Sequence, residues 1–146
     1  MADGSTYKEA VDNIEVVIQE WIEAAKDLDW RLCEAMSRKD LDALMAFFWD
    51  SPDLIVVLFG NLLRGEEAVR ASIAQMFEHN ESIKVTILES RSLPVGDAVM
   101  TVGTATYDLK PKNGTSVQIV EVWTDLIRKI DGRWVYVLDH ATMIPE

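Results

Sequence analysis

The stretch that decides the fold is Glu121-Val-Trp-Thr-Asp-Leu-Ile-Arg-Lys-Ile-Asp-Gly-Arg-Trp-Val-Tyr-Val-Leu-Asp-His-Ala-Thr142. Two runs rich in β-branched and aromatic residues flank Asp131-Gly132, and this dipeptide between such runs is a strong signal for a β-hairpin. The stretch therefore predicts two long antiparallel strands joined by a tight turn. It also places Glu121, Asp125 and Asp139 among apolar residues, so these carboxyl groups are the first candidates for a functional role.

Two registers of this hairpin are compatible with the sequence. A two-residue Asp131-Gly132 turn pairs Asp139 with Thr124, whereas a three-residue loop with Gly132 left-handed in a G1 bulge pairs Asp139 with Trp123. We favour the second register, because it puts Asp139 on the face that we expect to line the interior. Glu121, Trp123, Asp125 and Asp139 then share one face of the sheet.

The chain before the hairpin predicts helices and one short strand. Thr6-x-x-Glu9 resembles a capping box and is followed by apolar residues spaced three and four apart as far as Ala35, which indicates one long amphipathic helix. Ser37-x-x-Asp40 predicts a second helix that begins at Arg38 and runs through Phe48. A turn at residues 50–53 leads to an apolar strand at 54–59 and a small hairpin arm at 62–64.

A third helix is predicted from Glu66 to His79-Asn80, because carboxylates are favourable at a helix start. The period then changes to two, which indicates strands at roughly 82–93, 97–109, 115–129 and 133–144. Helices followed by a meander of strands predict an α+β fold with helices on one face of a curved antiparallel sheet. We expect one domain over residues 1–146, with residues 1–5 disordered.

Composition narrows the function classes. The formal net charge is −11, with 25 acidic and 14 basic residues, so a nucleic-acid binder or a protein of anionic membrane surfaces is not expected. No apolar run is long enough to cross a bilayer, and the first residues do not resemble a secretory signal. The single cysteine, Cys33, fits a reducing compartment, and we expect a cytoplasmic protein.

The last strand predicts a partner subunit. On 133–144 the residues at odd positions and those at even positions are both mostly apolar, so each face of the strand needs a cover. The helices supply one cover, and a second copy of the chain is the simplest candidate for the other. We therefore predict a homodimer interface on the even-numbered face, with Trp134, Tyr136 and His140.

The residues from Trp123 to Thr142 resemble the NTF2-like superfamily, and within it the SnoaL-like (ketosteroid-isomerase-like) domains. Matches at 38–44, Ser51-Pro-Asp53 and Arg64-Gly-Glu-Glu-Ala68 extend the resemblance over most of the chain from about Asp27. The resemblance implies a cystatin-like cone, in which a bent sheet of mixed strand order wraps around a long N-terminal helix and two shorter ones. It also implies a pocket at the open end and dimers through the convex face of the sheet, but no single activity.

Asp139 and Asp125 are the candidate catalytic residues. Carboxyl groups crowded in an apolar cavity have raised pKa values, so one of them can act as a general base or acid near neutral pH. The alternative is that each carboxyl only bonds a backbone group, an indole or an arginine and orders the sheet. His140 cannot pair with Asp139, since adjacent strand residues point to opposite faces.

Aromatic residues are the candidate lining of the pocket, although aromatics at helical or strand spacing are usually core. Two functions follow as hypotheses: acid/base catalysis without a cofactor (isomerase, dehydratase or cyclase) on an apolar small molecule, or a non-catalytic homodimeric ligand-binding or interaction module. No metal site is expected, because the two histidines and the cysteine are far apart. The predicted ligand-binding residues are Trp30, Trp49, Phe59, Tyr107, Glu121 and Trp123.

Overall fold

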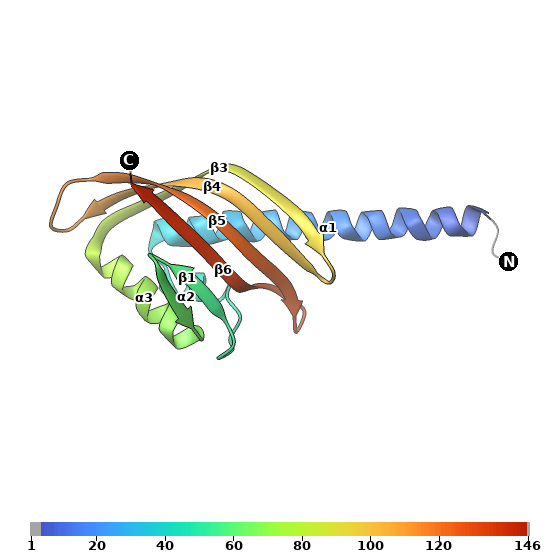
Figure 1. Ribbon diagram of the computed structural model, residues 1–146, viewed down its shortest axis with the longest axis horizontal. Helices are drawn as coiled ribbons and strands as arrows, with labels where there is room; N and C mark the ends of the chain where they lie inside the picture. The colour runs from blue at the N-terminus through green and yellow to red at the C-terminus, as the bar shows by residue number, and fades with distance from the viewer. Residues whose placement is uncertain (1–3, 146) are drawn as a thin grey trace.

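The computed structural model describes residues 4–145, and the side chains of residues 6–144 (Figure 1). Three helices and six strands follow the predicted order, and the α+β class is confirmed. The elements are α1 (Gly4–Arg38), α2 (Leu41–Met45), β1 (Ile55–Leu58), β2 (Asn61–Arg64), α3 (Glu66–His79), β3 (Asn80–Val95), β4 (Ala98–Pro111), β5 (Val117–Ile130) and β6 (Arg133–Pro145).

The strands form one curved sheet in the order β2-β1-β6-β5-β4-β3. All neighbours are antiparallel except β1 and β6, which run parallel, so the sheet is mixed. The sheet bends over the C-terminal half of α1. Helices α2 and α3 and the β1–β2 hairpin lie together below the long strands in the view of Figure 1. The N-terminal half of α1 projects beyond the turn between β3 and β4 (Figure 1). Within the described residues, no helix has a stretch long and apolar enough to cross a membrane.

Helix α1 is one continuous helix of 35 residues. It begins at Gly4, two residues before the predicted capping box. Residues 4 and 5 of the segment predicted to be disordered are therefore helical, and residues 1–3 lie outside the described part. The apolar stripe packs against the sheet only in the second half, where Ala25 and Ala35 are 0% exposed and Leu28 is 4% exposed. Burial of this stripe, at about 25 cal/mol per Å² of apolar surface, anchors the helix inside the curve of the sheet.

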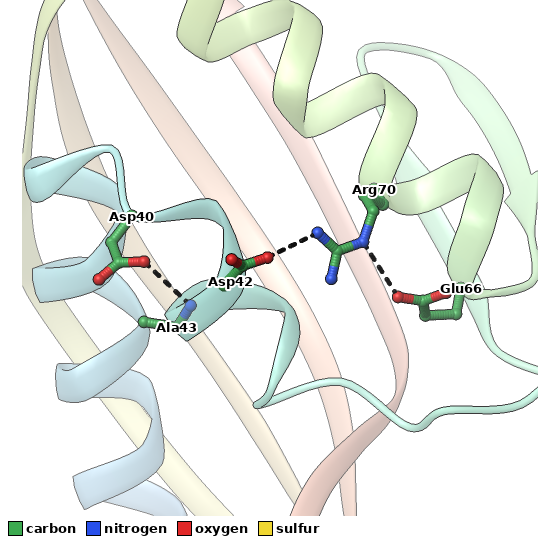
Figure 2. A network of polar contacts seen from close by, with 5 residues as sticks. All are labelled: Asp40, Asp42, Ala43, Glu66 and Arg70. Atoms are coloured by element: carbon green, nitrogen blue, oxygen red, sulfur yellow. Dashed lines mark hydrogen bonds and ion pairs between the residues drawn. The ribbon is translucent and has the colours of Figure 1, made fainter.

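The second helix begins later than predicted. Ser37 belongs to α1, which ends at Arg38, and Lys39 takes the left-handed conformation (φ 55°) that often follows a helix. Asp40 is the N-cap of α2, and its Oδ1 accepts a hydrogen bond of 3.1 Å from the Ala43 amide (Figure 2). The predicted start of the helix is therefore wrong. Asp40, the last residue of the predicted motif, caps the helix, and Ser37, its first residue, does not.

Helices α2 and α3 are joined by an arginine. Figure 2 shows Arg70 of α3 between Asp42 of α2, at 2.9 Å, and Glu66 one turn earlier on α3, at 3.2 Å. Such exposed pairs contribute little to stability, and only the pair with Asp42 connects the two helices. The two helices contribute Leu44, Met45, Val69 and Ile73 to the core of the cone.

The predicted hairpins are present. Phe59 and Gly60 join β1 to β2 with φ values of 53° and 76°, and Asp131 and Gly132 join β5 to β6 with φ values of 51° and 79°. Two consecutive left-handed residues define the type I′ turn, whose twist matches that of the strands. The β5–β6 turn therefore has two residues, and the favoured three-residue loop is wrong.

A β-bulge further along the hairpin changes the register again. Ile127 pairs with Tyr136, but Leu126 pairs with Leu138, so Val137 is the extra residue of β6. Beyond it Asp139 pairs with Asp125, which neither predicted register gives. The predicted consequence nevertheless holds, because a paired residue shares its partner's face and Asp125 is on the concave side with Glu121 and Trp123.

Because of the bulge, two of the three residues predicted for the dimer interface face the interior instead of the convex side. Tyr136 pairs with Ile127 on the concave side and is 0% exposed, so its side chain is not available to a partner subunit. Trp134 lies on the same side, half-buried, with its ring in edge contact with Trp21 at 5.9 Å between centroids. Only His140, which follows the bulge, lies exposed on the convex face as expected.

The bulge is stabilised by a segment far away in the sequence. The chain after α2 does not continue as a helix to Phe48, as predicted, but forms a bridge beside β6. The Tyr136 amide donates to the Phe47 carbonyl, and the Trp49 amide donates to the Tyr136 carbonyl, both at 2.9 Å. These bonds pair the backbone of Tyr136 on one side of the bulge, while β1 pairs with residues 138–140 on the other.

Candidate functional site

The site is built on one transverse row of the sheet. Thr101 of β4, Asp125 of β5 and Asp139 of β6 are direct cross-strand partners, and all three point to the concave side. Because side chains alternate along a strand, the next inward residues are Trp123 and then Glu121 on β5. Regular alternation on β4 and β5, with the bulge on β6, thus brings three carboxyl groups to one part of the concave face.

A cavity of about 50 Å³ lies between this row and the helices. That is room for a few water molecules or a compact ligand. Most of its wall is apolar, and the polar groups are carboxyls, one hydroxyl, one thiol and one indole; no Lys, Arg or His belongs to the described lining. The lining residues are Asp29, Leu32, Cys33, Met36, Phe48, Val56, Leu58, Ile73, Ile87, Ala105, Tyr107, Glu121, Trp123, Asp125, Asp139 and Ala141.

Asp29 enters the cavity from α1. It lies on the buried side of the helix, one position after Leu28, and is 4% exposed. The Tyr136 hydroxyl donates a hydrogen bond of 2.5 Å to its Oδ1, while its Oδ2 has no hydrogen-bond partner among the described residues. The bulge at Val137 therefore serves Asp29 as well, since it is what allows both Tyr136 and Asp139 to face the interior.

Trp123 fits because its neighbour on β4 is a glycine. A Cβ atom on Gly103 would lie 2.5 Å from the Trp123 ring and 2.2 Å from the Glu89 carbonyl oxygen, closer than any side chain can approach. The indole lies over β4, and its Nε1 donates to the Thr101 hydroxyl at 3.3 Å. The ring thus has a fixed place in the wall of the cavity, beside the carboxyl groups.

Burial raises the pKa of every carboxyl in the cavity. The pKa of Asp29 rises from 3.8 to about 6, chiefly by desolvation, although the bond from Tyr136 lowers it. The pKa of Glu121 rises from 4.5 to about 7 through desolvation and repulsion from Asp139, and a hydrogen bond with Tyr107 offsets part of the rise. Near neutral pH both groups therefore exchange protons readily.

Asp125 and Asp139 form an acidic pair in which the charge on one carboxyl opposes the charge on the other. The pKa of Asp125 lies well above its ordinary range, first because of its burial and next because of the charge on Asp139. Burial also raises the pKa of Asp139, but a hydrogen bond from Asp125 favours its charged form. Two carboxyls in contact cannot both ionise, so protonated Asp125 beside ionised Asp139 is the favoured state. Oδ1 of Asp125 has no hydrogen-bond partner among the described residues.

The remaining reactive group is a poor nucleophile. Burial and the nearby Glu121 and Asp29 charges raise the pKa of Cys33 to about 12, so its thiol stays protonated. Within the described residues, no group of three or more His, Cys, Asp and Glu side chains is arranged to hold a metal ion. Acid/base chemistry by carboxyl groups is what this arrangement can perform.

The predicted site residues separate into two groups. Tyr107, Glu121, Trp123, Asp125 and Asp139 all line the cavity. The other three predicted ligand-binding residues do not line it: Trp30 is 65% exposed on the outer side of α1, Phe59 is 44% exposed in the β1–β2 turn, and Trp49 is half-buried beside β6.

Asp29 is the residue that the sequence analysis missed. A usable signal was present, because Asp29 lies among Ala25, Leu28, Leu32 and Cys33 on the side of the helix that carries the apolar stripe. An acidic residue on an apolar helix face is rarely buried without a partner, so it indicates a polar interior.

Comparison with protein families matches the SnoaL-like domain to residues 30–137. The match covers well over half of the chain, including Glu121 and Asp125 of β5, and ends at residue 137, before Asp139. The chain belongs to the SnoaL-like domain family. None of the curated proteins compared with the sequence matches it.

Solved structures show the same NTF2-like fold. A candidate dehydratase of the NTF2-like family from Streptomyces avermitilis is 21% identical, with a TM-score of 0.73 over 86% of this chain and 96% of that one. An NTF2-like protein of unknown function from Shewanella oneidensis is 30% identical, with a TM-score of 0.63 over 82% and 96%. A candidate aromatic ring hydroxylase from Novosphingobium aromaticivorans is 16% identical, with a TM-score of 0.77 over 87% and 94%.

Proposed function

We propose that this SnoaL-like protein binds a small apolar molecule in the cone and performs acid/base chemistry on it without a cofactor. The observation that carries the proposal is that Asp125 and Asp139 lie side by side on paired strands in a cavity with apolar walls. Their raised pKa values favour one protonated and one ionised carboxyl. An acid and a base held side by side can protonate one atom of a ligand and deprotonate another.

The roles follow from the favoured protonation state. Asp139, as the carboxylate, removes a proton from the ligand, and Asp125 donates its proton to the atom on which negative charge develops or to the departing oxygen. Glu121 and Asp29, with pKa values of about 7 and about 6, can exchange protons with the pair between turnovers. Trp123 and Tyr107 form the walls that orient a flat or compact apolar ligand.

Dehydration, isomerisation and cyclisation all need this combination of acid and base. One of the structures with this fold is a candidate dehydratase. In a dehydration the base removes a proton from carbon while the acid protonates the leaving hydroxyl, so water departs and a double bond forms. The pair supplies both groups at one place, and we propose dehydration or isomerisation as the reactions to test first.

The charge of the cavity restricts the ligand. Four carboxyl groups line it, and the described lining holds no cationic side chain to bind an anion. An anionic ligand would add a further negative charge in a medium of low dielectric constant, where repulsion between charges is strong. We therefore propose a neutral or positively charged ligand.

A panel of three ligands of equal size tests the site. Benzyl alcohol, benzylamine and benzoate differ mainly in charge, and thermal shift assays with each measure binding to the folded state. We expect stabilisation by the neutral or the cationic compound and none by benzoate. Stabilisation by benzoate alone would contradict the proposed ligand charge.

Two variants on the same strand test the role of Asp139. Asp139→Asn removes the base from the cavity, whereas Thr142→Asn changes an exposed residue on the convex face of β6. We expect Asp139→Asn to lose at least about tenfold in turnover of a responding alcohol or enone substrate, and Thr142→Asn to lose none. Equal activity of the two variants would refute the catalytic role.

The proposal includes a homodimer through the convex face. His140, Val102 and Val122 lie exposed on that face, with 37% and 38% exposure of the two valines. Replacing Val122 with Glu would place a charge at the centre of such an interface. We expect sedimentation velocity to show a smaller species for this variant than for the wild type; an unchanged sedimentation coefficient would count against this interface.

A further inference from the structure

An apolar stripe continues along α1 beyond the sheet. Tyr7, Val11, Ile14, Ile18 and Trp21 follow one another at alternating spacings of four and three residues. The same alternation continues through the buried positions from Ala25 to Ala35. A repeat of 3.5 residues sustained along a helix is the pattern of a coiled coil, in which two helices pack their stripes together.

The two halves of the stripe differ in what covers them. The second half packs against the sheet, where Ala25 is 0% and Leu28 is 4% exposed. In the first half Tyr7 is 73% and Ile14 is 58% exposed, and the helix projects beyond the β3–β4 turn (Figure 1). An exposed apolar face of this kind on a soluble protein marks a surface for a partner.

We propose that residues 4–21, the projecting helix, pair with the projecting helix of a second copy of this chain in an antiparallel coiled coil. A two-fold axis near residues 12 and 13 aligns the two stripes, so that Val11 packs against the partner's Ile14 and Tyr7 packs against the partner's Ile18. Four such apolar layers form, since each pairing occurs twice by symmetry.

Charges beside the stripe favour this orientation. The residue after each of Tyr7 and Ile14 is charged, and the two charges are opposite: Lys8 and Glu15. In the antiparallel register given above, Lys8 of each copy lies beside the partner's Glu15. In a parallel pair Glu15 would lie beside the partner's Ala10 instead, with no complementary charge.

The ion pair that Lys8 forms within its own helix does not prevent the two helices from pairing. Lys8 forms an ion pair of 3.1 Å with Asp12, but the side chains are 78% and 56% exposed. Exposed pairs one helical turn apart are weak, so the lysine can turn to a second carboxylate at little cost.

A groove beside the stripe provides further room for the partner helix. Ile14, Val17, Ile18 and Trp21 form one wall, and Pro94 and Gly96 of the β3–β4 turn form the other. In the proposed register the first turn of the partner's helix lies opposite residues 17–21, which is where this groove opens.

Two matched variants test the pairing in the full-length protein. Ile14→Glu places a charge in the stripe, whereas Val16→Glu places the same charge on the opposite side of the helix, at a residue that is 56% exposed against 58% for Ile14. Sedimentation velocity at a series of micromolar concentrations should show association weakened at least about tenfold by Ile14→Glu and unchanged by Val16→Glu, because only the first buries an unpaired charge. Identical sedimentation of the two variants would overturn the proposal, whatever the state of the convex face.

Mixing two charge variants tests the orientation. Lys8→Glu gives a chain with two acidic residues beside the stripe, and Glu15→Lys gives a chain with two basic ones. Antiparallel pairing predicts that each variant associates more weakly alone and that the mixture forms mixed dimers in preference to either homodimer, measured with one variant labelled. A statistical mixture would overturn the antiparallel register.

Discussion

Strand β6 has two halves that meet at Val137 and present opposite sets of side chains to the interior. In the half next to the turn, the even-numbered residues Trp134 and Tyr136 face the core. In the half after the bulge, the odd-numbered residues Asp139 and Ala141 face the cavity, while His140 is exposed. One extra residue thus gives one strand an aromatic, structural half and an acidic half that belongs to the site.

The comparison shows how the site depends on the bulge. Tyr136 donates a hydrogen bond to Asp29, and Asp139 contacts Asp125, so the two halves supply different carboxyl groups with their partners. A regular strand could place only one of Tyr136 and Asp139 inside, because their positions differ by an odd number. Bulges near functional sites commonly redirect side chains in this way.

Insertion of one alanine after Leu138 is the most severe way to remove the difference between the halves. The inserted residue would pair with Asp125, which exchanges Asp139, Ala141 and Met143 for His140, Thr142 and Ile144 on the concave side. We expect a loss of about 4 kcal/mol or more in the free energy of unfolding, measured with urea, since half of a core strand would be inverted.

An insertion in a loop provides the control for this effect. One alanine inserted after Asn113, in the exposed turn between β4 and β5, lengthens the chain equally but inverts no strand, and we expect a change below about 1 kcal/mol. Equal stability of the two insertion variants would show that the register after the bulge does not determine the interior.

The acidic half should make stability depend on pH. Asp29 and Glu121 have pKa values of about 6 and about 7 in the fold, above their ordinary values of 3.8 and 4.5. The folded state therefore binds protons more tightly than the unfolded chain, and the free energy of unfolding falls as pH rises from about 4 to about 7. We expect a loss on the order of 5 kcal/mol over that range in urea unfolding.

A double variant isolates the contribution of these two groups. Asp29→Asn with Glu121→Gln removes both titrations while keeping the shape of the side chains, and the dependence on pH should become flatter. A wild type that grows more stable between about pH 4 and pH 7 would contradict the raised pKa values.

Tyr136→Phe tests the link between the two halves. The change removes the hydroxyl that donates to Oδ1 of Asp29, so neither oxygen of that buried carboxyl has a donor among the described residues. We expect a loss of about 2 kcal/mol at neutral pH and a smaller loss below the pKa of Asp29, where the carboxyl is protonated. Urea unfolding at the two pH values measures the difference; an equal loss at both would show that the hydroxyl does not stabilise the charged form.

Gly132→Ala tests whether the turn or the bulge sets the register. Gly132 has a φ of 79° with no atom near its missing side chain, so alanine there costs backbone strain of about 1 kcal/mol without a clash. We expect slightly lower stability in urea and unchanged ligand binding, because the bulge and its bonds to Phe47 and Trp49 remain. Loss of ligand binding with retained folding would assign the register to the turn instead.

The sequence by itself determined most of the elements. Turn residues such as Asp131-Gly132 and the change from helical to two-residue periodicity predicted the α+β order, the hairpins and the third helix. Alternation along one regular strand also predicted correctly that Glu121, Trp123 and Asp125 share the concave face. These features depend on neighbours in the sequence, which is why local patterns are sufficient to predict them.

Only the tertiary structure decided the contents of the site. Backbone hydrogen bonds between residues 47–49 and Tyr136, almost ninety positions apart, stabilise the bulge at Val137. No local sequence pattern in β6 therefore predicts the bulge. The entry of Asp29 into the cavity depends in the same way on how α1 crosses the sheet. Backbone pairing between segments that are distant in the sequence determined that the odd-numbered residues after the bulge face the cavity. This pairing placed Asp139 beside Asp125.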